Sequence, residues 1–182
     1  MSKKHYIVTS ITLGVIGACS AGLIGLANLV TRDKISANEQ NKIQVGITSI
    51  FGDSASIDNE YELHDNKYTN YVYEIKISDV VESYAFRTTG SNMYGKISLL
   101  VGINKTYLLS SSNPVFSFVN LYVITNEQTY ASTLVDNYII PLNDGDRSLD
   151  DVSCGATYGA KLVRDMVEEA KTVADKVFGE DY

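Results

Sequence analysis

The chain has 182 residues, with 22 acidic and 15 basic side chains and a formal net charge of −7 at neutral pH. So acidic a surface argues against a nucleic-acid partner, because binding to nucleic acid requires lysine and arginine side chains that neutralise phosphates. Only two cysteines are present, Cys19 in an apolar run and Cys154 near the C-terminus, so we expect no intrachain disulfide.

The N-terminal region contains a long uncharged run, which extends from Tyr6 to Val30. As a helix, residues 7–30 measure about 36 Å at about 1.5 Å per residue, which exceeds a hydrocarbon core of about 30 Å. We therefore predict a single transmembrane helix at residues 7–30 of a cell-membrane protein. Lys3 and Lys4 flank its N-terminal side closely, whereas Asp33 interrupts the basic residues beyond its other end. This asymmetry favours a cytoplasmic segment at residues 1–6 and an extracytoplasmic C-terminal domain.

Two other interpretations of this run stay open: a lipoprotein cleavage site at Ile16-Gly17-Ala18-Cys19, with Cys19 lipidated, and a cleaved secretory signal. The apolar run continues for eleven residues beyond Cys19, which favours a retained span. Small residues recur near one face of the predicted helix and would allow another membrane helix to approach closely, so we expect membrane partners. These residues are Gly14, Ala18, Gly22 and Gly25.

Residues 31–51 have apolar positions at a helical spacing, at Ile43, Ile47, Ile50 and Phe51, and we predict a helical stalk there. The polar segment 52–66 is predicted to be a loop or a partly ordered insertion. Alternation of apolar and polar residues predicts a strand at 71–77, which a short turn at Ser78-Asp79 joins to a second strand at 80–86. A glycine-containing loop is expected at 88–96, and further strands at 97–104 and 115–124.

Residues 143–146 form a turn-like acidic cluster, Asn-Asp-Gly-Asp. The spacing and terminal glutamate of an EF-hand are missing, so we predict no metal site. The chain also has no Walker loop, no dinucleotide-binding glycine motif and no cysteine cluster for an iron–sulfur centre. Its only histidines are His5 and His64, and His64 lies in a polar loop. Any redox chemistry must therefore come from a bound cofactor.

The last part of the chain predicts an amphipathic helix that packs on the sheet, because its apolar residues repeat every three or four positions. Short polar residues and a Gly-Ala pair precede this helix, and we expect short polar side chains to cap its first turn. Thr157 is predicted at or near that turn. Unpaired N–H groups and the positive end of the helix dipole make such a position suitable for a phosphate. Ordinary helix capping also accounts for these residues taken alone. The overall prediction is an α+β protein with an N-terminal transmembrane helix and stalk, followed by a small antiparallel-sheet domain at residues 52–182.

The segment Asp151-Val152-Ser153-Cys154-Gly155-Ala156-Thr157 resembles the Asp-x-x-(Ser/Thr)-Gly-Ala-(Thr/Ser) motif of the FMN-binding domain family. This family includes the G subunit of the Rnf electron-transport complex and the C subunit of sodium-translocating NADH:quinone reductase. The resemblance implies that Thr157 carries FMN through a phosphoester bond formed by a separate flavin transferase. It also implies that the transferase reads Asp151, Gly155 and Ala156. Cys154 replaces the usual Ser or Thr.

Other segments are similar to the same family. Residues 35–39, Ile-Ser-Ala-Asn-Glu, resemble the Ile-Ala-x-Asn-Glu stretch that follows the membrane anchor of the G subunit. Gly95, Ile97 and Val101-Gly102-Ile103 match a second family segment, in which Met93 and Lys96 replace Tyr and Pro. Gln128 and Thr129 correspond to the first part of Glu-Thr-Pro-Gly-Leu-Gly, which lies against the flavin in the family. The Pro-Gly-Leu-Gly part is absent here, and Tyr130 offers an alternative stacking surface.

The resemblance implies an electron-transfer subunit that carries covalent FMN and belongs to an ion-translocating, Rnf-type ferredoxin:NAD oxidoreductase complex. Its partners would be the other membrane subunits and, during maturation, the flavin transferase. Such a chain is part of a redox-driven ion translocase and not a complete enzyme. Two alternatives stay open: a stand-alone flavinylated carrier for extracellular electron transfer, and a surface scaffold domain that holds no flavin.

Overall fold

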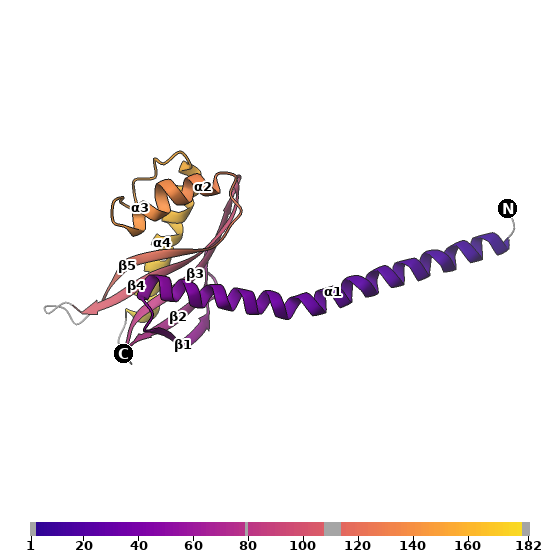
Figure 1. Cartoon of the computed structure of the whole chain (residues 1–182), viewed down its shortest axis with the longest axis horizontal. Coiled ribbons are helices and arrows are strands. Elements are labelled where there is room, and N and C mark those ends of the chain that lie inside the picture. Colours follow the sequence, from indigo (N-terminus) through magenta and orange to yellow (C-terminus); the bar gives the residue numbers. More distant parts are fainter. Residues whose placement is uncertain (1–2, 79, 108–113, 180–182) are drawn as a thin grey trace. The chain divides into compact units, whose positions relative to one another are not determined.

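The computed structural model describes the backbone of residues 3–78, 80–107 and 114–179, and within these ranges the side chains of all but residues 3–11, 23–37 and 80–82. The described chain forms two compact units, residues 1–41 and residues 42–182. One continuous helix, α1 (Lys3–Phe51), contributes to both units (Figure 1).

The first unit consists of the larger part of α1. Among the residues whose side chains are described, no helix is both long enough and apolar enough to cross a membrane. The predicted span at residues 7–30 lies largely outside those residues, since only the side chains of residues 12–22 within it are described.

The second unit is an α+β domain with an antiparallel sheet and a C-terminal helix, as predicted, and the sheet has five strands, one more than the sequence indicated. Its strands are β1 (Ala55–Glu62), β2 (Thr69–Ile77), β3 (Val80–Asn92), β4 (Gly95–Tyr107) and β5 (Pro114–Asn126). They follow one another across the sheet in sequence order, and every neighbouring pair is antiparallel. Three short helical segments follow, α2 (Ala131–Leu134), the π-helical turn η1 (Val135–Ile139) and α3 (Ile140–Asn143), before the long helix α4 (Thr157–Phe178).

Both faces of the sheet are covered. Successive residues of a strand point to opposite faces, so neighbouring residues belong to different cores. Phe86 and Leu99 belong to one core with α4 and the α2–α3 segment. Their sequence neighbours Ala85 and Leu100 belong to a second core with the last turns of α1, where Ile43, Ile47 and Ile50 are buried. Residues 42–51 of the predicted stalk are therefore part of the domain. Figure 1 shows α4 behind the strands, with α2 and α3 beside its N-terminal half.

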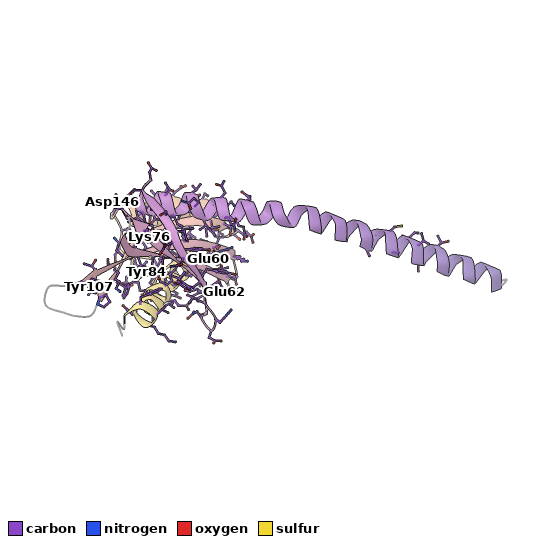
Figure 2. The ribbon with its side chains drawn as sticks, turned by 90° about the horizontal axis from the view of Figure 1, so that it is seen from below. Glu60, Glu62, Lys76, Tyr84, Tyr107 and Asp146 are labelled. Atoms are coloured by element: carbon purple, nitrogen blue, oxygen red, sulfur yellow. The ribbon has the colours of Figure 1, made fainter. Side chains whose placement is uncertain are left out.

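Close packing fixes α4 along its whole length. Gly90 of β3 leaves room for Leu162 and Met166, because a Cβ atom at this position would lie 2.8 Å from the Leu162 Cδ1 atom. At the other end of the helix, the rings of Tyr84 and Phe178 stack with their centroids 4.1 Å apart. Figure 2 shows Tyr84 beside α4. The N-terminus of α4 thus has a defined position against the sheet.

Two local predictions were wrong, and one helical region was missed. The predicted loop at 52–66 contains strand β1, which is exposed along most of its length and pairs with β2 through its backbone and through polar side chains. Lys76 forms an ion pair with Asp58 at 2.5 Å, and Asn59 donates to Glu74 at 2.7 Å. The predicted loop at 88–96 is instead a tight turn between β3 and β4. The helical segments at 131–143 were not predicted, because they are short and a π-helical turn interrupts the usual helical spacing.

Candidate functional site

The first turn of α4 lines a cavity of about 290 Å³ in the second unit. Its walls come from three parts of the chain: the turn between β3 and β4, the segment after β5, and the residues around the N-terminus of α4. None of the described residues that line it carries a charged side chain. The lining residues are Tyr94, Gln128, Tyr130, Leu134, Gly155, Ala156, Thr157, Tyr158 and Gly159.

Helix α4 begins at Thr157 without a side-chain cap, contrary to our prediction. Its N-cap residue is Ala156, which has no side chain able to accept a hydrogen bond. Gly155 precedes it with a φ of +83°, so the chain turns directly into the helix. Asp151, the nearest acidic candidate for a cap, is instead paired with Arg147 at 3.3 Å. The Ser153 N–H also donates to Asp151, at 3.4 Å.

The uncapped start leaves backbone donors open at the cavity. Ala160 is the first residue to donate within the helix, from its N–H to the Ala156 carbonyl at 3.0 Å. The N–H groups of Thr157, Tyr158 and Gly159 therefore have no partner inside α4. The positive end of the helix dipole lies at the same place. Together these features favour a negatively charged group next to Thr157.

Thr157 is half-buried in the cavity wall. Within the part of the chain that the structure describes, its hydroxyl makes no hydrogen bond to another protein group. A hydroxyl at such a position can accept a bond from a ligand, donate one, or be joined covalently to a phosphate.

The turn between β3 and β4 forms the opposite wall and is held by several hydrogen bonds. Gln128 is buried and donates from Nε2 to the Gly95 carbonyl at 2.6 Å. Thr129 donates its N–H at 2.8 Å and its hydroxyl at 3.1 Å to the Tyr94 carbonyl. Asn92 joins this turn to α4, since its Oδ1 accepts from the Tyr94 N–H and its Nδ2 donates to the Tyr158 carbonyl at 3.1 Å. The two walls are thus tied together.

The segment that leads into α4 is braced from the π-helical turn. Asn137 donates from Nδ2 to the Cys154 carbonyl at 3.2 Å, and the Tyr138 hydroxyl donates to the Leu149 carbonyl at 2.6 Å. Burial raises the pKa of Tyr138, so the hydroxyl keeps its proton for this bond. Arg147 completes the brace by donating to the carbonyls of Asp151 and Ser153.

The structure brings together some of the residues singled out in the sequence but not all. Gln128, Gly155, Ala156 and Thr157 line the cavity. Thr129 does not line the cavity, but its hydroxyl donates to the carbonyl of Tyr94, which does. Cys154 is only 6% exposed and packs in the main core, and the Asp151 side chain faces Arg147. Neither of these two side chains lines the cavity.

Sequence reasoning missed several residues of the site. Tyr94, Leu134, Tyr158 and Gly159 line the cavity. The positions of Tyr94, beside the turn residue Gly95, and of Tyr158, directly after Thr157, were the only signals in the sequence. Asn92 and Asn137 gave none, since their roles depend on contacts between distant segments. Among the described residues, no group of three or more histidine, cysteine or acidic side chains is arranged to hold a metal ion.

Comparison with known proteins gives no relative: no family model matches the chain, and a search of curated proteins finds no match.

Proposed function

We propose that this chain is a membrane-anchored electron-transfer subunit that carries FMN covalently on Thr157. The observation that carries the proposal is the position of one hydroxyl. Thr157 lies at the uncapped start of α4, in the wall of a cavity lined by aromatic rings, and its hydroxyl has no described protein partner. The motif that resembles the flavin attachment motif ends at this same residue.

The residues around Thr157 suit a flavin phosphate. A phosphoester on the Thr157 oxygen would lie close to the free N–H groups of the first turn of α4, which stabilise its negative charge. Gly155 and Ala156 add no bulk beside it. A flavin that is covalently attached to the protein is not lost to the surrounding medium, which suits a cofactor that works outside the cell.

The cavity suits the ring of the flavin in size and chemistry. Its volume of about 290 Å³ is at the lower end of the range for small-molecule sites, and its lining is neutral, with three tyrosine rings and one buried leucine. When bound, the isoalloxazine ring supplies one-electron and two-electron redox chemistry. Gln128 and the tyrosines replace the missing Pro-Gly-Leu-Gly segment as the ring's surroundings.

The proposal includes a single transmembrane span at residues 7–30, with residues 42–182 on the outer face of the membrane. The run from Tyr6 to Val30 without a charge supports the span. The small residues within the run support contact with other membrane subunits, as in an Rnf-type complex that couples electron transfer between ferredoxin and NAD to ion movement.

The test is expression of the full-length chain together with a flavin transferase, followed by denaturing electrophoresis and detection of flavin fluorescence in the gel. We expect a fluorescent band for the wild type and none for Thr157→Ala. Ser153→Ala is the matched control, because it removes a nearby exposed hydroxyl from the same segment and should leave the band unchanged.

A fluorescent band from Thr157→Ala would show that another residue holds the flavin. A dark wild-type band in the presence of an active transferase would instead favour the flavin-free scaffold. The stand-alone carrier is distinguished by purification from native membranes, since it would be isolated without the other subunits of a complex.

A further inference from the structure

Three tyrosine side chains meet at the cavity from separate parts of the fold. Tyr94 comes from the turn between β3 and β4, Tyr130 from the segment after β5, and Tyr158 from the first turn of α4. The Tyr94 ring centroid lies 5.8 Å from that of Tyr130 and 5.5 Å from that of Tyr158. The planes are inclined by 59° and 40°, so the three rings form an angled surface and not a closed stack.

Much of this ring surface is exposed to water, and the Lys161 ammonium lies over one of the rings, 6.0 Å from the Tyr158 centroid. Tyr130 is 52% exposed and Tyr158 is 59% exposed, although aromatic rings contribute much of the apolar area that proteins normally bury. Tyr94 between them is held in place by its backbone bonds to Asn92 and Thr129. An exposed aromatic group on a fixed backbone, at the edge of a cavity, is typical of a binding site.

The chemistry of the lining restricts the ligand. Among the described residues, none that lines the cavity is charged, so a charged ring would gain no ion pair with the lining itself, and the Lys161 ammonium over the Tyr158 ring disfavours a cation. Leu134 and the faces of the phenol rings favour a flat apolar surface, whereas Gln128 and the tyrosine hydroxyls favour polar groups at its edge. The lining therefore selects a neutral, planar heteroaromatic ring with polar edges.

We propose that the three tyrosines bind the isoalloxazine ring of a flavin noncovalently, without any bond to Thr157. The identity of the ring rests on the proposed function, but the binding itself does not require the phosphoester. Such binding would hold the ring in the cavity whether or not the phosphoester to Thr157 is present.

The experiment uses the full-length Thr157→Ala variant and riboflavin, so that neither the acceptor hydroxyl nor a phosphate is present. Riboflavin emission is measured as protein is added, because an electron-rich phenol ring in contact with a flavin quenches its emission by a transient electron transfer that returns to the ring. We expect saturable quenching. A second change, Tyr158→Leu, should weaken binding about fivefold, which is the size expected for loss of one aromatic pair.

Tyr61→Leu is the matched control, since Tyr61 is an exposed tyrosine on β1 that does not line the cavity, and it should leave the binding curve unchanged. Tyr94→Leu, checked for folding by circular dichroism, should weaken binding at least as much as Tyr158→Leu. Quenching that does not saturate, or a curve unaffected by both cavity variants, would overturn the inference.

The result is independent of the covalent link. Riboflavin binding in a chain that never acquires covalent flavin would retain this inference and reject the proposed function. Covalent attachment of flavin to the wild type, without riboflavin binding to Thr157→Ala, would retain the proposed function and reject this inference.

Discussion

The side chain of Glu169 on α4 accepts hydrogen bonds from three successive backbone N–H groups, those of the two residues before β2 and of the first residue of β2. Its Oε1 accepts from Tyr68 at 2.7 Å and from Thr69 at 2.8 Å, and its Oε2 accepts from Lys67 at 3.2 Å. Thr69 is only 1% exposed, so in the folded protein its N–H is shielded from water and has the carboxylate as its partner. We predict that Glu169→Ala is strongly destabilising.

The magnitude follows from the two shorter bonds. Leaving a buried donor unpaired costs about 1–3 kcal/mol, and a hydrogen bond to a charged group contributes about 1.5–3 kcal/mol. Allowing for partial exposure of Glu169, we expect a loss of about 3 kcal/mol in the free energy of unfolding. For a chain of this size that loss lowers Tm by about 6–12 °C. Glu169→Gln should lose less, because an amide oxygen can still accept at the Oε1 position.

The assay is thermal and urea unfolding of the full-length chain, followed by circular dichroism. Glu168→Ala is the matched control: it changes the preceding glutamate, which is exposed, and should shift stability by no more than about 0.5 kcal/mol. We expect the order Glu168→Ala, Glu169→Gln, Glu169→Ala, from least to most destabilised. Equal stability of Glu168→Ala and Glu169→Ala would refute the reasoning, since the three N–H groups would then not depend on the carboxylate.

Three further predictions concern the cavity wall at Gly95 and the π-helical turn that braces the segment before α4. Gly95 has a φ of +131°, and a Cβ there would overlap the Glu127 carbonyl oxygen, so Gly95→Ala should cost at least about 2 kcal/mol in urea unfolding. Gly145→Ala, at a φ of +78° in open space, should cost only about 1 kcal/mol; equal losses would argue against the overlap. Asn137→Ala removes the bond to the Cys154 carbonyl and should slow flavin attachment at Thr157 severalfold, with a stability loss of only about 1 kcal/mol. Equal rates of flavin attachment in Asn137→Ala and in the control Asp136→Ala would show that Asn137 does not position the attachment segment. Burial raises the pKa of Tyr138 above its usual value of about 10, so the unfolded chain loses this proton first. The stability that Tyr138 provides below pH 10 should therefore decrease as the pH rises further, and urea unfolding at about pH 9 and 11 should show a smaller decrease for Tyr138→Phe than for the wild type.

Much of the sheet could be predicted from the sequence because its inner strands are buried on at least one face. The alternation at 71–77 and the apolar run at 97–104 reflect this burial directly. Strand β1 has no such signal, because it lies at the sheet edge and contacts β2 through polar side chains. Burial patterns predict a strand only where a face is covered.

The candidate site was predictable only in part, for a related reason. A local motif identified Thr157, and local sequence also gave Gln128. The cap was wrong because Asp151 is paired with Arg147, a contact that no sequence pattern indicated. The three tyrosines of the cavity are up to 64 positions apart in the sequence. Their approach depends on contacts between distant segments, such as those from Asn92 to the Tyr158 carbonyl and from Thr129 to the Tyr94 carbonyl. Contacts that depend on the tertiary fold leave no periodic signal.

Covalent flavin on Thr157 is tested by mass spectrometry of the intact chain isolated from its native membrane, followed by peptide mapping. We expect an added mass equal to FMN minus water, located on the peptide that contains Thr157. An unmodified Thr157 in a preparation from cells with an active flavin transferase would contradict the proposed attachment.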